Sequence, residues 1–291
     1  SNGGSIGSGE GAAGTVEIVG APTPSLEDRS MWNAGNSATV TVGGAGGQGS
    51  LFVSNDGVFH SGGLDISASD ANGHTGSAIM TISSDADVST ANTGAIGSYA
   101  GSAGSVTVSG FGSSWGSSTL VVGSVGTGSL RVEDSGFVQT LVGRIGFATG
   151  SQGSVTVTGE GSLLRATTSL YVGDLGQGSL TVENGGDVRS TGGRIGQSAG
   201  GSGTALVTGN GSQWDARGGL LAIGDLGSAS LAVTNQGRLL ADTINIGTTG
   251  ASAAFTASGG ATVESDSASV GYAADRDGSA TITGNGTSWN V

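Results

Sequence analysis

Apolar residues recur along this chain in short alternating triplets. In Val106-Thr-Val108 two apolar residues flank a polar one, which is the pattern of a strand with one buried face. Between Leu51 and Ala280 the triplets advance by 229 residues in nine steps, so the repeat is about 25 residues long. The triplets start at Val16, Leu51, Met80, Val106, Leu130, Val155, Leu180, Ala205, Leu231, Phe255 and Ala280.

Each repeat has two more apolar positions. The second position follows eight or nine residues after the triplet start and holds tryptophan in one type of repeat, with Leu164 as a substitute. The third is an apolar residue before glycine, as in Val122-Gly123. Three short strands per repeat predict an all-β fold, a right-handed single-stranded parallel β-helix (β-solenoid) of about eleven coils of ~25 residues.

The domain organisation follows from the repeat. We expect residues 1–14 to be a flexible N-terminal segment and residues 15–291 to form a single β-solenoid domain. A loop insertion is expected around residues 21–31, where the spacing lengthens and both prolines occur. The last coil stops at Trp289-Asn-Val291 before its third strand, so we expect the domain to be truncated in its last coil and the natural protein to continue.

The insertion is the candidate partner-contact loop. The role that we favour for it is a shield over the open N-terminal edge of the solenoid, because an uncovered strand edge invites pairing with another chain. The candidate contact residues are Pro22, Pro24, Glu27, Asp28 and Arg29.

Composition narrows the range of partners. The net charge is −13, with nine basic residues that are all arginine, so nucleic acid and anionic membrane surfaces are not expected partners. Cysteine is absent, which excludes disulfides and thiolate metal sites. No run approaches 18 consecutive apolar residues, so this segment is not expected to insert into a membrane.

A run of two motifs carries a family resemblance. Gly104-Ser-Val-Thr-Val-Ser-Gly-Phe-Gly-Ser-Ser-Trp115 is followed by Leu120-Val-Val-Gly-Ser-Val-Gly-Thr-Gly-Ser-Leu-Arg-Val132. These units, over roughly residues 32–291, resemble the repeat of passenger domains of bacterial type V autotransporters and related exported surface proteins. The resemblance implies an extracellular location at the bacterial cell surface and carries over no catalytic residues.

We therefore expect a non-catalytic surface passenger domain, acting as an adhesin or self-association module or as a rigid stalk. Its expected partners are a host or neighbouring-cell surface, a glycan, or another copy of itself. The alternative is a structural subunit of an extracellular filament or sheath that assembles through the solenoid ends.

Two other functions have some support in the sequence. Asp174 and Asp225 occupy equivalent Gly-Asp-Leu-Gly corners two coils apart, as a carboxylate pair in a polysaccharide-cleaving enzyme would require, although a repeated turn residue explains both. Outward hydroxyls on the triplet strands form a candidate hydroxyl face like that of an ice-binding solenoid, although the ordinary β-propensity of threonine on an exposed strand accounts for them. The candidates for this face are Thr107, Ser109, Thr156, Thr158, Thr281 and Thr283.

No metal site or cofactor is expected. His60 and His74 are interpreted as solvated loop residues. Calcium stays open as an alternative at Asp70-Ala-Asn-Gly73 and Asp275-Arg-Asp-Gly278, which have only some of the ligands of a calcium loop. The tryptophans are interpreted as core or corner residues, with sugar stacking as the alternative.

Overall fold

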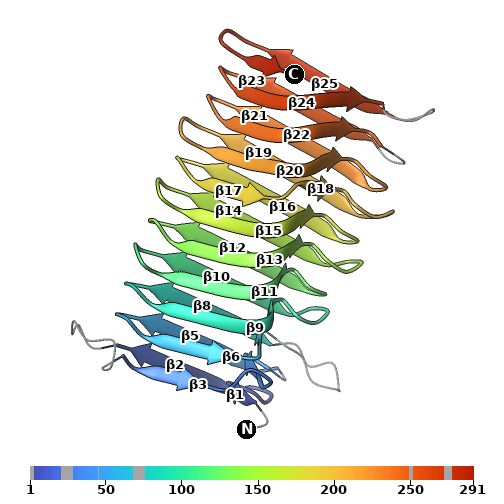
Figure 1. Ribbon diagram of the computed structural model, residues 1–291. Helices are drawn as coiled ribbons and strands as arrows, with labels where there is room; N and C mark the ends of the chain where they lie inside the picture. The colour runs from blue at the N-terminus through green and yellow to red at the C-terminus, as the bar shows by residue number, and fades with distance from the viewer. Residues whose placement is uncertain (1–2, 21–28, 45, 68–75, 249–251, 272–276) are drawn as a thin grey trace.

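Parallel strands stacked along one axis make up the whole described molecule (Figure 1). The structure is a computed structural model that describes residues 3–20, 29–44, 46–67, 76–248, 252–271 and 277–291. It is all-β, and every strand pair is parallel in this described part. The described residues include no helix that could cross a membrane. The predicted β-solenoid is confirmed.

The triplets form one continuous sheet, here called the triplet sheet. It has 11 strands, one from each coil, as the repeat predicts. The strands of the triplet sheet, in order, are β2 (Ala13–Val19), β5 (Gln48–Ser54), β8 (Ser77–Ser83), β10 (Ala103–Ser109), β12 (Thr127–Glu133), β14 (Gln152–Thr158), β16 (Gln177–Glu183), β19 (Ser202–Thr208), β21 (Ser228–Thr234), β23 (Ala253–Ser258) and β25 (Gly278–Thr283).

The other two predicted strands of each coil belong to a second sheet, here called the bent sheet. It contains 15 strands. They are β1 (Gly4–Ile6), β3 (Met31–Asn33), β4 (Thr39–Val42), β6 (Val58–Ser61), β7 (Gly63–Ile66), β9 (Asp87–Ile96), β11 (Ser114–Val122), β13 (Phe137–Ile145), β15 (Leu163–Val172), β17 (Asp187–Ser190), β18 (Gly193–Ile195), β20 (Gln213–Ile223), β22 (Arg238–Ile246), β24 (Thr262–Val270) and β26 (Ser288–Asn290).

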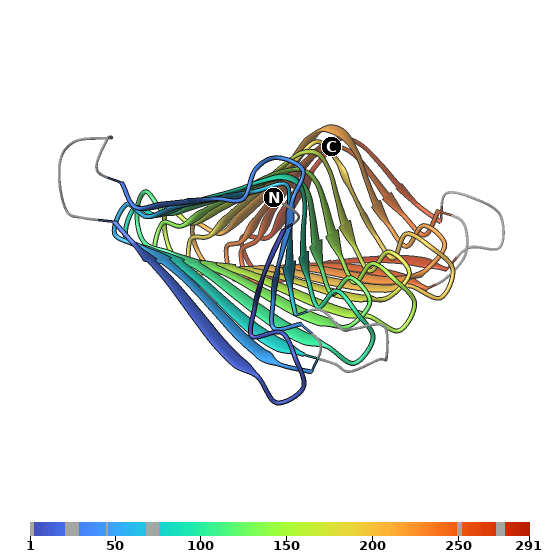
Figure 2. The same cartoon turned by 90° about the horizontal axis from the view of Figure 1, so that it is seen from below.

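The second and third strands of a coil differ from the prediction in one respect. In most described coils they form a single strand that turns a corner, and the register between coils shifts there, as between Ser117 and Thr119 of β11. They separate fully in pairs such as β17 and β18. The view along the axis in Figure 2 shows the resulting three-sided cross-section.

The boundary expected at residue 14 is corrected by strand β1. Gly4–Ile6 pairs in register with β4, and the Ile6 side chain, opposite Val42, is only 4% exposed. β2 likewise begins at Ala13 and not after residue 14. Ile6-Gly7 has the apolar-then-glycine signature of a third strand, so this segment closes against the next coil and is not a flexible segment.

Equivalent apolar residues stack into ladders that form one core along the axis. Val106, Leu130 and Val155 are register partners in three successive coils and are all buried. The core cluster of the described residues runs from Ile6 to Val263. A single coil cannot bury its own apolar face, so burial depends on the stacking.

Glycine follows the third strand because the next coil passes very close. Gly173 has φ +72°, and a Cβ added there would lie 2.1 Å from the carbonyl oxygen of Ser202. The Gly173 amide also donates to the carbonyl oxygen of Ile145, at 2.7 Å. The corner therefore needs both the left-handed conformation and the missing side chain.

We predict that Gly173→Ala destabilises the fold far more than Gly150→Ala. Gly150 also has a positive φ, +82°, but no atom lies within 4 Å of its added Cβ. Gly150→Ala should cost about 1 kcal/mol of unfolding free energy, from backbone strain alone. Gly173→Ala should cost about 3 kcal/mol or more, because backbone of the next coil must also move. Urea unfolding of both variants tests this, and equal losses would contradict the account.

All four tryptophans lie in the core or pack against it, and three of them donate the indole N–H to a hydroxyl of the preceding coil. Trp214 is fully buried, and its Nε1 donates to Ser190 Oγ of the preceding coil at 3.0 Å. Trp115 donates in the same way to Thr90, at 3.2 Å, and Trp289 to Ser265, at 3.0 Å. The interpretation of these tryptophans as core residues is confirmed for Trp115 and Trp214. We call this the pairing rule: a buried or partly buried tryptophan of this set donates its indole N–H to a hydroxyl in the preceding coil.

Ser61 is the matched control for this hydrogen bond. It occupies the position of Ser190 in its own coil, but the next coil has Val88 where Trp214 would be, and the buried Ser61 hydroxyl has no partner. Ser190→Ala should lower the unfolding free energy by about 1–3 kcal/mol, because a buried indole N–H loses its acceptor. Ser61→Ala should leave it unchanged or raise it. Thermal and urea unfolding distinguish the two, and equal effects would refute the pairing rule.

Candidate functional site

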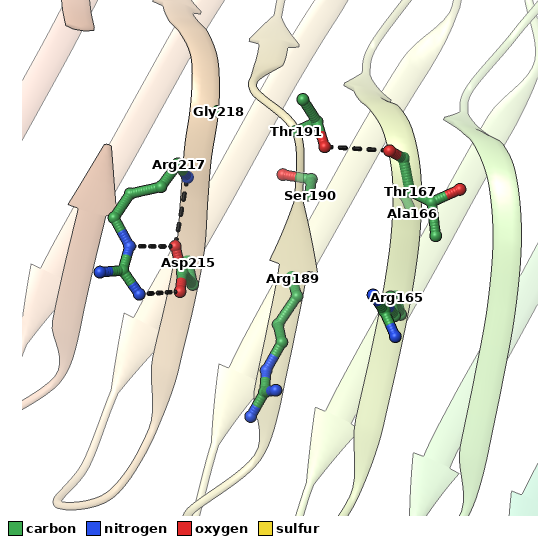
Figure 3. Close-up of a pocket in the computed structure, with 9 residues that line it drawn as sticks. All are labelled: Arg165, Ala166, Thr167, Arg189, Ser190, Thr191, Asp215, Arg217 and Gly218. Atoms are coloured by element: carbon green, nitrogen blue, oxygen red, sulfur yellow. Dashed lines mark hydrogen bonds and ion pairs between the residues drawn. The ribbon is translucent and has the colours of Figure 1, made fainter. Parts of the chain in front are cut away.

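A groove lined with arginine lies on the outside of the bent sheet, across β15, β17 and β20 (Figure 3). Its volume is about 500 Å³. Three of the nine arginines of this acidic chain line it, together with one carboxylate. The lining residues are Arg165, Ala166, Thr167, Arg189, Ser190, Thr191, Asp215, Arg217 and Gly218.

The groove exists because neighbouring coils turn the corner with different numbers of residues. Between Ala216 and Leu220 of β20 three residues pass the corner, whereas only Asp242 lies between the matching residues of β22. The extra residues, 217–219, form a bulge, and Gly218 adopts φ +99° within it. On the other side β17 ends at Ser190 before the corner. The bulge therefore forms one wall of the groove.

Arg217 is fixed on this wall by a two-pronged ion pair. Its Nε donates to Asp215 Oδ1 at 2.9 Å and its Nη2 to Asp215 Oδ2 at 2.5 Å. The Arg217 hydrogen bonds lower the pKa of the Asp215 carboxyl, although burial opposes this. The amide of Gly218 donates to Asp242 Oδ2 at 2.9 Å. The bulge is thus held by two carboxylates.

Arg189 is held from its own strand. Its Nε and Nη2 donate to Asp187 Oδ2 at 2.8 and 2.6 Å. The hydrogen bond and charge of Asp187 raise the pKa of the Arg189 guanidinium, and Asp215 adds to this. Arg189 lies next to Asp215 in the register between β17 and β20. Arg189 is thus an exposed residue of the groove lining with carboxylates on its own strand and on the next one.

Arg165 differs from the other described arginines. It is exposed and lies directly beside Arg189 in the register of β15 and β17. Of the eight arginines in the described part of the chain, seven form ion pairs, and Arg165 has no ion pair or hydrogen bond. Its guanidinium therefore brings an uncompensated positive charge to the groove.

Threonines supply hydrogen-bond acceptors along the same groove. Thr191 Oγ1 donates to the carbonyl oxygen of Thr167 at 2.9 Å. Thr167 Oγ1 in turn donates to the carbonyl oxygen of Thr140, at 3.4 Å. Because each hydroxyl donates its hydrogen to a backbone carbonyl, the lone pairs of each oxygen can accept a hydrogen bond from a ligand.

The C-terminal side of the groove is acidic. Beyond the Arg217 wall, a second hollow of about 410 Å³ is lined by Asp242, Glu264 and Asp266, among others. On the N-terminal side, the register partner of Arg165 is the uncharged, exposed Gln139. The positive charge of the groove is therefore confined to the three neighbouring coils of β15, β17 and β20.

The candidate partner-contact loop falls almost wholly outside the described residues. Pro22, Pro24, Glu27 and Asp28 are in that group. Arg29 is described, and its Nη2 donates to Asp56 Oδ1 at 3.0 Å and to the carbonyl oxygen of Asp85 at 3.3 Å. Its side chain is thus engaged by turns of the next two coils.

The candidate hydroxyl face is present as a column on the triplet sheet, with interruptions. Thr107 and Thr156 are half-buried, and Arg131 lies between them in the register. Ser109 is also half-buried, and its register partner in the next coil is Glu133. Charged side chains therefore break the hydroxyl array.

Thr158 is corrected as a member of this face. It is 6% exposed, and its Oγ1 accepts a hydrogen bond from Asn184 Nδ2 at 3.1 Å. The turn of the following coil covers it. Thr281 and Thr283, in the last strand of the triplet sheet, are exposed.

Asp174 and Asp225 stabilise the corners in which they lie by binding side chains of neighbouring coils. The buried Asp174 carboxylate accepts hydrogen bonds from Arg144 and, at 3.2 Å, from Ser198 Oγ. Asp225 pairs with Arg194 and accepts from Thr248 in the same way. Both carboxylates tie one coil to its neighbours.

The Arg144 guanidinium also lies against aromatic rings, 5.2 Å from the ring centre of Phe147 and 4.8 Å from that of Tyr171. Such contacts add a cation–π attraction to the ion pair with Asp174. Arg144 is therefore held from three sides, which fixes the corner that Asp174 occupies.

His60 is not the loop residue that its sequence context suggests. It lies on β6, with Nδ1 2.7 Å from Ser89 Oγ and Nε2 2.5 Å from Asn36 Oδ1. His74 and most of both calcium-loop candidates lie outside the described residues. Among the described residues, no three His, Asp or Glu side chains gather where they could hold a metal ion.

Sequence reasoning missed the groove, although the spacing contains a signal. Ile223 is nine positions after Trp214, whereas Ile246 is only seven positions after Leu239 at the same two places of the next coil. An alignment of the coils also places Arg165 and Arg189 at one outward position, directly after Leu164 and Val188.

Fold and groove together define a parallel β-solenoid with a cationic groove on one lateral face. Comparison of the chain with protein-family models, curated proteins and solved structures found no match.

We predict that Asp174→Asn lowers the unfolding free energy by about 2 kcal/mol, because it leaves Arg144 without its carboxylate. Asp225→Asn should cost less, since the Asp225 side chain is 19% exposed against 5% for Asp174. Urea unfolding measures both losses. If Asp174 were instead a catalytic carboxylate, Asp174→Asn would abolish turnover of a polysaccharide while stability stayed unchanged.

Proposed function

We propose that this chain is a non-catalytic surface module of an exported bacterial protein that binds through the lateral faces of a rigid solenoid. The observation that carries the proposal is the unbroken register of the triplet sheet across 11 strands. It fixes outward side chains in columns with a spacing of about 4.8 Å. Binding of a ligand to such a face costs little conformational entropy, because the protein side of the interface is already ordered.

The length of the stack suits this role. Eleven coils at about 4.8 Å each give a rod about 50 Å long, and the core ladders make it stiff along the axis. Such a rod can hold a binding surface away from a cell. The same geometry supports the stalk function, in which the rod presents another domain.

The groove on β15, β17 and β20 is the part of the described surface that we assign to ligand binding. It combines guanidinium groups with threonine oxygens on rigid strands, the composition that a polar ligand such as a glycan requires. Its chemistry favours the glycan among the expected partners. The resemblance to autotransporter passenger domains supports a location at the bacterial cell surface.

Adhesion predicts a soluble protein that binds a surface saturably. The test incubates the fluorescently labelled chain with bacterial and animal cells and with an immobilised glycan library, using the heat-unfolded chain as control. Analytical ultracentrifugation of the same samples reports self-association. We expect saturable binding, lateral dimers, or both.

Three other results would contradict adhesion. Concentration-dependent fibres would favour the filament alternative. A monomer that binds no surface and does not self-associate would leave only the stalk function. Turnover of a polysaccharide would overturn the non-catalytic assignment.

A further inference from the structure

We propose that the groove binds an oligosaccharide with a single carboxylate, of the uronic-acid or sialic-acid type, whose carboxylate lies between Arg165 and Arg189. This inference rests on the proposed binding function and names its ligand class. It starts from the exception among the arginines, because Arg165 alone of the eight described ones has no carboxylate partner.

The placement of Arg165 suits a carboxylate ligand. Its neighbour in the register is Arg189, so the two arginines project from the same face of strands whose backbones lie roughly 4.8 Å apart. A planar carboxylate accepts two parallel hydrogen bonds from one guanidinium, and such charge-assisted bonds are among the stronger ones in proteins. Arg189 is already shared with Asp187, so Arg165 is the main anchor.

The groove also suits the hydroxyls of a sugar. The oxygens of Thr167 and Thr191 have donated their hydrogens to backbone and can accept from sugar hydroxyl groups. Acceptors beside a cationic anchor match a ligand that has many hydroxyls and one acid group.

The surroundings limit the ligand to one negative charge. Asp215 lies within the groove, and Asp242, Glu264 and Asp266 lie beyond the Arg217 wall. A polyanion that crossed these coils would meet repulsion, and the net charge of −13 adds to it. The uncharged part of the ligand therefore extends over Gln139, on the N-terminal side of Arg165.

The experiment is isothermal titration calorimetry of the whole chain with matched acidic and neutral probes. Sialyllactose and lactose form one pair, and a glucuronate-ended disaccharide and cellobiose form the other. We expect an acidic probe to bind and its neutral counterpart to bind at least about tenfold more weakly, the equivalent of one charge-assisted bond. The pair that responds distinguishes the sialic-acid type from the uronic-acid type.

Three variants locate the site. Arg165→Gln should weaken binding of the acidic probe at least about tenfold. Asp215→Asn should strengthen it about threefold, because it removes the carboxylate of the groove and frees Arg217. Arg131→Gln, an exposed arginine on the triplet sheet, is the matched control and should leave the affinity unchanged. A gain in Asp215→Asn cannot arise from misfolding, and circular dichroism checks the other two variants.

The inference is overturned if Arg165→Gln and Arg131→Gln bind alike, if Asp215→Asn weakens binding, or if the neutral probe binds as well as the acidic one. Tighter binding of a heparin fragment or of single-stranded DNA at Arg165 would also overturn it, since these are polyanions. If no acidic probe binds but the chain still binds cells or neutral glycans, this inference fails and the proposed function stands. If nothing binds and the chain does not self-associate, both fail.

Discussion

Hydrogen bonding between successive coils is the interaction on which this structure depends. The amide of Gly146 donates to the carbonyl oxygen of Val122, that of Gly173 to Ile145 and that of Gly196 to Val172, so the same bond recurs from coil to coil. A coil makes few contacts within itself, and its apolar side chains are buried only by neighbours. Any change in the length or path of one coil therefore has to be absorbed by the coils on both sides.

This constraint explains where variation is tolerated. The triplet sheet keeps its register throughout, whereas the corner between the second and third strands takes up extra residues by bulging outward. A bulge there keeps the inward ladders on both sides, since Trp214 and Ile223 still oppose Leu239 and Ile246. The corner can thus change the surface without disturbing the core, and the groove lies at such a corner.

The sequence predicts the stacked fold well because each coil repeats the same inward positions. Alternation at Val106 and Val108 gives the strand, and the recurring apolar residue before glycine gives the corner. The prediction fails at Ile6, because Ile6-Gly7 carries only one of the three apolar signals by which a coil is identified. It fails also at Thr158, because exposure there depends on Asn184 of the next coil, which the strand pattern does not include.

The groove escaped prediction for a related reason. Arg165, Arg189 and Arg217 are far apart along the chain and belong to no motif, and only the register brings the first two side by side. The register by itself would give only an open column of arginine side chains. The wall that turns this column into a groove is formed by the bulge with Arg217 and Gly218. A repeat fold therefore places its distinctive chemistry where the repeat is broken. A search for sites in such chains gains most from aligning the coils first and then comparing corner lengths and outward charges between neighbours.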